Sequence, residues 1–168
     1  SGYEIPAVME VHNGNWVEYG DDNNYFGELI ERYLGSPTNS RCINGISDMI
    51  YGRGLDALDS SEKPEMYGKM KALLTSECVK KVSSDLKMLG QAAVQVIYKN
   101  KKKEIASLHH FPMETLRAEK AVNGKVEAYY YHSKWSDIKP SDKPKRIPTF
   151  SHFPKIIFCH SVSNDEFN

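Results

Sequence analysis

The stretch WVEYGDDNNYFGELIERYLGS, residues 16–36, joins an aromatic and acidic turn directly to an amphipathic helix. Carboxylates just before a helix stabilise its dipole and cap its free N–H groups, so a structural role accounts for the acidic pair. An active-site loop that binds a cation or transfers protons is one alternative, and a loop that contacts a neighbouring chain is another. The side chains that would carry these roles are Trp16, Tyr19, Asp21, Asp22, Asn23 and Tyr25.

Two helices follow from the pattern of this region. The apolar residues of the stretch recur at helical spacing and predict a first helix over residues 24–34. Gly35 is expected to end this helix in the left-handed conformation. Ser36 then predicts the cap of a second helix, with Pro37 at its first position, where a missing N–H costs nothing. We expect the second helix to end at the glycines of YGRGL and to bury Cys42, Ile43, Ile46, Met49 and Ile50.

The pattern then changes from helices to strands. Residues 56–64 predict a loop, and two further helices are expected over 65–74 and from 75 or 76 to 89. After them, QAAVQVIY predicts a central strand and EIASLHHF its return strand. Asn123-Gly124 predicts a hairpin that leads into KVEAYYYHS, and KIIFCHS predicts one last strand. This order indicates an α+β fold, with N-terminal short helices followed by an antiparallel sheet with hairpins.

The same order divides the 168 residues into four parts. We expect an extended N-terminal segment over 1–22, an α+β core over 23–132 (helices 24–89, strands 91–132), a Pro-rich surface loop or arm over 133–154, and a final strand with tail over 155–168. The sequence has no apolar run of about 18 residues, which a membrane-spanning helix would need. Three widely spaced cysteines favour a reducing compartment over a disulfide framework.

Charge is unevenly distributed along a chain whose formal net charge is zero. Residues 1–62 carry eleven acidic and three basic side chains, whereas residues 63–168 carry eleven acidic and nineteen basic ones. This asymmetry indicates complementary patches within the fold or between copies, with ordinary solvated faces as the alternative. The lysines of a predicted hairpin turn could also contact nucleic-acid phosphate, and they are Lys99, Lys101, Lys102 and Lys103.

Histidine and cysteine spacing matches no established catalytic or metal-binding motif. His109 and His110 are adjacent in a predicted strand and point to opposite faces, so ideal strand geometry does not let both bind one metal ion. Cys159 and His160 are adjacent in the last strand, and the same geometry turns their side chains apart. We therefore expect no catalytic residue, no metal and no cofactor. A Cys-His hydrolase is the alternative that thiol labelling would reveal.

Residues 16–55 resemble the N-terminal region of portal proteins of tailed double-stranded DNA phages. The ordered positions that carry this resemblance are Trp16, Tyr19-Gly20, Asp22-Asn23, Tyr25, Ser36 and Gly52-Arg53-Gly54-Leu55. A later Pro-x-Glu-x-x-Arg turn and hairpin, in LHHFPMETLRAEK and GKVEAYYYHSKW, extend it through Pro112, Glu114, Arg117 and Trp135. The stem, clip and tunnel-lining segments of such proteins would follow this point, so the chain resembles a wing-like N-terminal fragment.

The resemblance implies a structural component and not an enzyme. Portal proteins form twelve-subunit rings through which DNA is packaged and ejected. The implied partners are copies of the chain itself, double-stranded DNA, the packaging ATPase, and capsid and head–tail connector proteins, with no membrane. The resemblance implies that catalysis belongs to the ATPase. The implied location is the virion, which is assembled in the cytoplasm of the bacterial host. The alternative function is a small nucleic-acid-binding module that uses the lysine turn and the basic residues of the Pro-rich arm.

Overall fold

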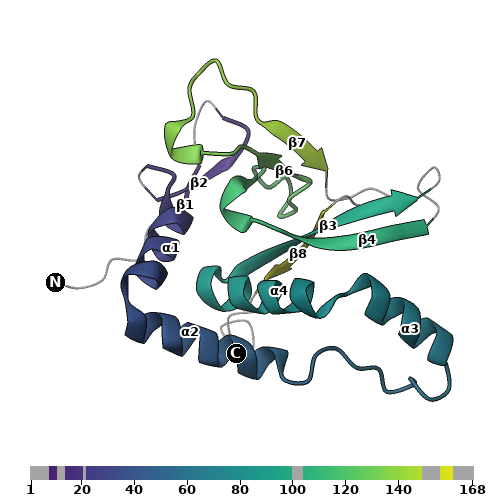
Figure 1. The fold of residues 1–168 in the computed structure, drawn as a ribbon. Coiled ribbons are helices and arrows are strands. Elements are labelled where there is room, and N and C mark those ends of the chain that lie inside the picture. Colours follow the sequence, from purple (N-terminus) through teal and green to yellow (C-terminus); the bar gives the residue numbers. More distant parts are fainter. Residues whose placement is uncertain (1–7, 11–13, 21, 100–103, 149–155, 161–168) are drawn as a thin grey trace.

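The computed structural model describes residues 8–10, 14–20, 22–99, 104–148 and 156–160. A short strand pair comes first, four α-helices follow, and the remaining strands come after them (Figure 1). This is the α+β fold that the order of sequence patterns predicts. The helices are α1 (Tyr25–Gly35), α2 (Pro37–Tyr51), α3 (Pro64–Leu73) and α4 (Ser76–Leu89).

The described strands form three antiparallel groups, ordered β1-β2, β4-β3-β8 and β5-β6-β7. β3 lies between β4 and β8, which confirms the prediction of a central strand. Two 3-10 turns, η2 (Met113–Thr115) and η3 (Trp135–Asp137), precede and follow the β5–β6 pair. The strands are β1 (Val8–Glu10), β2 (Val17–Tyr19), β3 (Gln91–Lys99), β4 (Glu104–Phe111), β5 (Leu116–Ala118), β6 (Ala128–Tyr131), β7 (Lys145–Pro148) and β8 (Ile156–His160).

The join between α1 and α2 follows the sequence in one respect and departs from it in another. The Ser36 side chain accepts a hydrogen bond from the N–H of Asn39, and Pro37 occupies the first turn of α2, as predicted. The prediction of a left-handed Gly35 is wrong, because Gly35 belongs to α1 and the chain reverses at Ser36 in an extended conformation. One residue thus ends the first helix and caps the second.

The apolar stripe of α2 is covered over only part of its width. α2 packs against α4 and α1, and the half-buried Ile43 and Ile46 lie beside Ser47, its one buried residue. Cys42 is exposed, and Met49 and Ile50 keep 73% and 54% of their surface exposed. The prediction that α2 buries all five apolar residues is therefore wrong for these three, since its neighbours reach only one narrow face.

The tight turn at residues 123–124 forms as predicted. Asn123 and Gly124 have φ angles of +53° and +73°, and Val122 and Lys125 exchange both main-chain hydrogen bonds across the turn. Part of segment 133–154 also forms regular structure. Trp135 begins η3, and β7 pairs with β6, so the expectation of a surface loop needs correction at these residues.

The core lies where α1 and α4 meet the start of β3 and the β5–β6 pair (Figure 1). Its buried members are Phe26, Leu89, Ala93, Met113, Leu116, Ala118 and Tyr129. β2 joins the outer edge of β5 through a bridge between Trp16 and Glu119, and through the N–H of Lys120, which donates to the carbonyl of Asn15. The turn after β2 is thereby held against the core. Among the helices described, none combines the length and apolar character that crossing a membrane requires.

Candidate functional site

Arg117 lies at the centre of the group of residues singled out by the sequence. It sits on β5 with 2% of its surface exposed. Its Nε donates to Oδ1 of Asn23 at 2.5 Å and its Nη2 donates to the Asn23 carbonyl at 2.6 Å. Its Nη1 donates to the carbonyls of Glu114 and Leu116 at 3.0 and 2.8 Å. Each of these four acceptors is a neutral oxygen, so the guanidinium acts here as a fork of donors that joins two chain segments.

Three aromatic rings surround the same guanidinium. Its central carbon lies 5.8 Å from the ring centre of Tyr19 and 5.3 Å from those of Phe26 and Trp135. Such distances allow cation–π attraction, which strengthens when water is excluded. Burial lowers the pKa of Arg117 to about 10, partly opposed by the negative charge of Glu18. At neutral pH the guanidinium therefore stays protonated and keeps all its donors.

Asn23 owes its place to an unusual backbone conformation. Its φ angle is +57°, in the left-handed region that asparagine tolerates better than most residues. The N–H of Asn23 donates to the carbonyl of Gly20, which closes the turn, and its Oδ1 also accepts from the N–H of Tyr19. Asn23 is 3% exposed, so its oxygens are withdrawn from water and directed at Arg117. A residue type suited to a turn thus supplies the acceptors for a buried cation.

The two tryptophans form the outer layer of the cluster. The ring centre of Trp16 lies 5.4 Å from that of Trp135 and 5.5 Å from that of Tyr130, in tilted arrangements. The indole Nε1 of Trp135 donates to the carbonyl of Thr115 at 2.9 Å. Tilted aromatic pairs at such distances stabilise beyond their buried area. These rings pack the residue just before β2 against β6 and η3, and the Trp135 hydrogen bond adds η2. From here on, the Arg117 cluster means Trp16, Tyr19, Asn23, Phe26, Arg117, Tyr130 and Trp135.

The other predicted residues of the turn lie around this cluster. Tyr25 is half-buried at the start of α1, with its ring centre 6.1 Å from that of Phe26. Asp22 is exposed, and its Oδ1 accepts a hydrogen bond from the N–H of Asn24, which fits a carboxylate at a helix entrance. Asp21 lies outside the described residues. The arrangement organises a chain turn and places no titratable pair for acid–base chemistry at the described positions.

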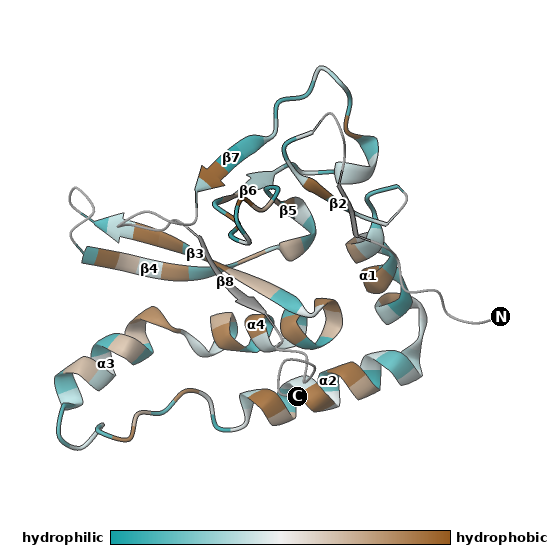
Figure 2. Ribbon diagram, turned by 180° about the vertical axis from the view of Figure 1, so that it is seen from behind, coloured by the Kyte–Doolittle hydropathy of each residue, from teal (hydrophilic) through white to brown (hydrophobic). Residues whose placement is uncertain are grey.

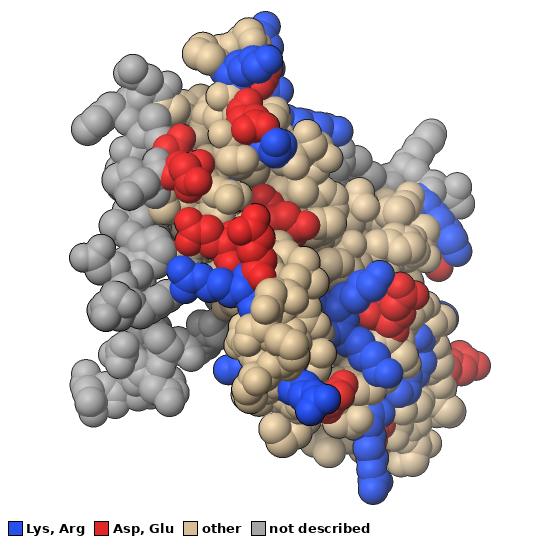
Figure 3. Space-filling view, turned by 60° about the vertical axis from the view of Figure 1, so that its left-hand side comes forward, with Lys and Arg blue, Asp and Glu red and all other residues tan. Residues whose placement is uncertain are grey.

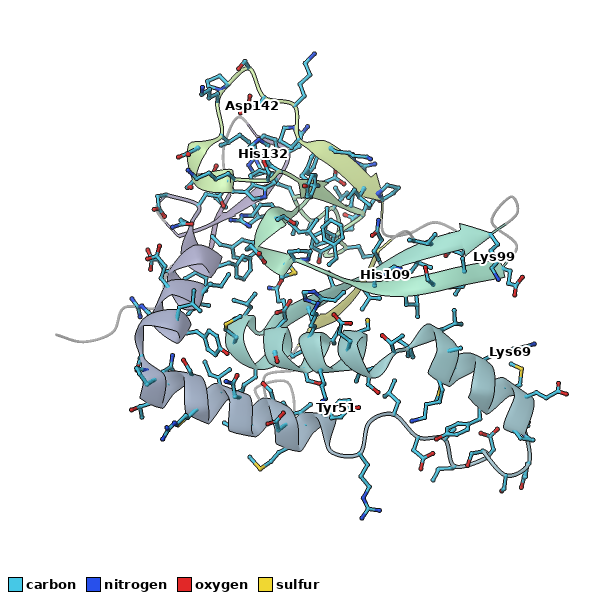
Figure 4. All side chains as sticks on the ribbon, in the orientation of Figure 1. Tyr51, Lys69, Lys99, His109, His132 and Asp142 are labelled. Atoms are coloured by element: carbon cyan, nitrogen blue, oxygen red, sulfur yellow. The ribbon has the colours of Figure 1, made fainter. Side chains whose placement is uncertain are left out.

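The predicted lysine turn is described only at its first residue. Lys99 is exposed at the end of β3, whereas Lys101, Lys102 and Lys103 lie outside the described residues. Figure 4 labels Lys99 at the far end of the β3–β4 hairpin, away from α1.

The histidine and cysteine candidates fall into separate environments. His110 faces α4, and its Nε2 lies 2.6 Å from Oδ2 of Asp85, while His109 is exposed and lies 3.0 Å from Oγ of Ser107. The two histidines thus face opposite ways, as strand geometry predicts. In the part of the chain that is described, no three His, Cys, Asp or Glu side chains group as metal ligands. The side chains of Cys159 and His160 are outside the description.

Burial determines the reactivity of the Cys78 thiol, which lies near His110. Cys78 lies on the first turn of α4 and is buried. Burial raises the pKa of the Cys78 thiol, with a smaller opposite effect from the main-chain N–H of His110. A raised pKa keeps the sulfur in its unreactive thiol form, so the position suits packing and not nucleophilic chemistry.

Reasoning from sequence reached the members of the Arg117 cluster but not their arrangement. Trp16, Tyr19 and Asn23 were proposed as a site from the first stretch, while Arg117 and Trp135 entered only through the later resemblance. Phe26 belongs to the helical apolar pattern of the first stretch, and Tyr130 to the strand expected after the turn at 123–124. A left-handed Asn beside a Tyr-Gly turn is the local signal that could have marked Asn23 as special. No local signal identifies its partner on β5.

Neither a protein-family model nor a curated protein matches the sequence. Among solved structures, a chain of the "Neck of empty GTA particle computed with C6 symmetry" matches 84% of this chain, with a TM-score of 0.63 and 12% identity. A chain of the "Virion of native gene transfer agent (GTA) particle" matches 82%, with a TM-score of 0.60 and 12% identity.

A third match has the same character. A chain of the "Neck of native GTA particle computed with C12 symmetry" matches 82% of this chain, with a TM-score of 0.60 and 11% identity. This chain spans between 36% and 38% of the three matched chains. The class that these comparisons define is therefore one of fold: the α+β chain described above is similar to part of a protein found in gene transfer agent particles.

Proposed function

We propose that this chain is the wing-like N-terminal part of a subunit of a phage portal ring, a structural component through which DNA is packaged and ejected. The observation that carries the proposal is the fold shared with chains of gene transfer agent virion and neck structures, at TM-scores of 0.60 to 0.63. One of those necks was computed with C12 symmetry, which agrees with the twelve subunits expected of a portal ring.

The Arg117 cluster adds independent support. The sequence resemblance to portal proteins rests on two separate sets of residues, one in the first stretch and one around the Pro-x-Glu-x-x-Arg turn. The structure joins these sets through the bonds from Arg117 to Asn23 and the contact of Trp16 with Trp135. In this proposal, the cluster fixes the entry to α1 and so shapes a surface that can meet a neighbouring subunit. The residues to which this interface or loop-organising role belongs are Trp16, Tyr19, Asp21, Asp22, Asn23 and Tyr25.

The proposed partners follow from the ring. Copies of the chain contact one another, double-stranded DNA passes through the central opening, and the packaging ATPase docks on the ring and is later replaced by head–tail connector proteins. Capsid proteins surround it in the virion. The chain itself carries no chemistry in this proposal, since the ATPase supplies it, and assembly takes place in the cytoplasm of the bacterial host.

The experiment is the native mass and negative-stain appearance of the full-length protein. Rings of about twelve subunits are expected. A head-to-tail interface that repeats with a fixed rotation forms a closed ring when the successive rotations add up to a full turn. Reversing the charges of Glu18, Asp22, Glu28 and Glu31 should lower the yield of rings, whereas Glu127→Lys serves as a control on another surface. A full-length protein that never forms rings would overturn the portal proposal.

A cleft favours the second candidate function, a nucleic-acid-binding module. It has a volume of about 280 Å³ and is lined by basic side chains, Lys145 and Arg146, beside the aromatic rings of Phe111 and Tyr131. Cations and stacking rings are the usual elements of a single-strand binding surface. This candidate predicts salt-dependent binding to single-stranded DNA that weakens when Lys145 and the lysines of 99–103 are neutralised. Absence of binding at low salt would remove it.

A further inference from the structure

The cleft that favours the second candidate function lies between the two three-stranded sheets. Gln95 of β3 and Phe111 of β4 line one side of it. Tyr131 of β6 and Lys145 of β7 line the other side. His110 faces α4, so its neighbour Phe111 lies on the opposite face of β4. Figure 1 shows β7 on this side of the β3–β4 hairpin, away from α4, so the cleft lies between surfaces of the two sheets.

Two aromatic rings give the cleft an apolar wall. Phe111 and Tyr131 are half-buried, and their ring centres lie 5.8 Å apart in an edge-to-face arrangement. In such a pair, the ring that presents its edge keeps both of its faces free of its partner. Ile147 adds an apolar side chain, and Figure 2 shows β7 changing from hydrophilic at its start to hydrophobic towards its end. A flat apolar group therefore fits against this wall.

Three polar groups beside the rings are available to a ligand. Within the described part of the chain, the side-chain polar groups of Gln95, Tyr131 and Lys145 make no hydrogen bond or ion pair. Lys145 lies directly opposite Tyr131 in the β6–β7 ladder, so the two side chains share one face. The second cation of the cleft, Arg146, already donates to both carboxylate oxygens of Glu119 at 2.7 Å. Lys145 is therefore the cation that can bind an anion here.

The charges around the cleft also favour an anion. Among the described residues that line it, none is acidic. A second cleft beside β7, of about 590 Å³, has Glu127 next to Lys125. Helix α1 carries Glu28 and Glu31, and Figure 3, with the α1 side of the molecule turned forward, shows a group of acidic side chains left of centre. A phosphate would be repelled at these other surfaces.

We propose that the cleft between the sheets binds one nucleotide. The base packs against Phe111 and Tyr131, and the phosphate binds the ammonium group of Lys145. The amide of Gln95 meets the polar edge of the base, because an amide offers both a donor and an acceptor. A volume of about 280 Å³ is near the lower limit for small-ligand sites, which suits a single nucleotide and not a row of stacked bases.

The nucleotide has two sources, a free nucleotide or one unit of a single strand. For a strand, the inference rests on the second candidate function and assigns its contact to this cleft. It does not depend on the portal ring, since a ring carries double-stranded DNA through its centre.

Titration calorimetry of the full-length protein with deoxyadenylate tests the site. Lys145→Met should weaken deoxyadenylate binding about tenfold, because the contact with the phosphate is lost. The same variant should leave binding of deoxyadenosine, which lacks the phosphate, unchanged. The matched control is Lys125→Met, an exposed lysine of the second cleft, which should alter neither affinity.

Two further variants test the contact with the base. Tyr131→Leu should weaken binding of both deoxyadenylate and deoxyadenosine about tenfold, because a base gains stability by packing on an aromatic ring. Tyr131 also packs against the core, so thermal unfolding of this variant is measured alongside. Gln95→Ala changes an exposed side chain and should weaken both ligands about fivefold without affecting the fold. Unchanged affinities in all three cleft variants would overturn the proposal.

A single strand of about ten deoxyadenylate units distinguishes the two sources. Tighter binding of the strand than of deoxyadenylate identifies a strand as the source, and equal or weaker binding identifies the free nucleotide. If a strand binds here, Lys145→Met should reduce the slope of log affinity against log salt concentration by about 0.7.

The outcomes separate this inference from the second candidate function. Strand binding that ignores Lys145→Met and Tyr131→Leu would overturn the cleft as the site and leave the nucleic-acid-binding candidate standing. Deoxyadenylate binding without strand binding would support the cleft and remove that candidate. Binding of neither ligand would overturn both.

Discussion

Arg117 binds both oxygen atoms of Asn23, a residue 94 positions earlier in the chain, through its Nε and Nη2. The contact joins the turn before α1 to strand β5 and closes a long loop of chain around the core. Because Arg117 is 2% exposed and Asn23 is 3% exposed, the hydrogen bonds are made away from competing water. The aromatic turn of the first stretch is therefore held by the core, and the surface of α1 that follows it is set in a fixed direction.

Arg117→Lys should destabilise the fold strongly. A lysine keeps the positive charge but cannot donate to Asn23, Glu114 and Leu116 from one planar group, so buried oxygens lose their partners. We expect the free energy of unfolding to fall by about 2–4 kcal/mol, measured by chemical denaturation. The matched control is Arg53→Lys at an exposed position, which should change it by less than about 0.5 kcal/mol. Equal denaturation midpoints for Arg117→Lys and Arg53→Lys would contradict the proposal that the hydrogen bonds of Arg117 stabilise the fold.

Two substitutions at Asn23 separate its backbone role from its side-chain role. Asn23→Gly keeps access to the φ angle of +57° but removes the oxygen that Arg117 and the N–H of Tyr19 bind. Asn23→Ala removes that oxygen and also strains the turn. Both should lower the free energy of unfolding, and the alanine variant should be lower than the glycine variant by about 1 kcal/mol. Equal free energies of unfolding for the two variants would show that the left-handed conformation does not destabilise the alanine variant.

A pair of glycines tests the same principle at sites free of contacts. Gly124 has a φ of +73° in the tight turn, and an added Cβ would meet no atom within 4 Å. Gly124→Ala should therefore destabilise by about 1 kcal/mol through backbone strain alone. Gly45 has equally open surroundings but lies within α2, so Gly45→Ala should stabilise by about 0.5–1 kcal/mol. Thermal unfolding of both variants checks the opposite signs.

Local chemistry explains which parts of the fold could be predicted. The cap at Ser36 and the turn at 123–124 each depend on neighbouring residues, and each was predicted from the sequence. The expected left-handed Gly35 failed because Ser36 reverses the chain on its own. Local rules predict where a helix ends. They do not predict which residue changes the direction of the chain, because that depends on how the next helix packs.

Contacts between distant segments explain the rest. The exposure of Met49 could not be predicted from the sequence of α2. An apolar pattern shows how wide the apolar face of a helix is, but not how much of that face the neighbouring elements cover. Strand β7 has the sequence KRIP, whose proline and basic residues are typical of a loop, and only pairing with β6 makes it a strand. The bond from Arg117 to Asn23 has no local signature in either segment. The candidate site was thus predictable as a set of residues and not as one cluster.

The two described cysteines should differ in reactivity. Cys42 is exposed on α2, whereas Cys78 is buried, and burial raises the pKa of its thiol. We expect a thiol reagent to label Cys42 rapidly in the native protein and Cys78 only after unfolding. Mass spectrometry of the labelled peptides measures both rates, and labelling of Cys42→Ser gives the rate of the remaining thiols alone. Rapid native labelling of Cys78 would contradict its burial and would revive a catalytic reading of the thiols.

The pair formed by Glu119 and Arg146 should make stability depend on acid pH. Nε and Nη2 of Arg146 each donate to one carboxylate oxygen of Glu119 at 2.7 Å, and this hydrogen bonding lowers the pKa of Glu119 below its ordinary value of 4.5. The carboxylate therefore stabilises the fold above pH 4.5, and that contribution is lost as the pH falls through the lowered folded-state pKa. Glu119→Gln should accordingly be less stable than the parent at pH 7 and should lose less stability on acidification to about pH 3. Glu77→Gln, which breaks an exposed pair with Lys81, is the control and should alter neither value appreciably. Parallel acid profiles for the parent and Glu119→Gln would show that the bond between β7 and the end of β5 does not stabilise the sheet.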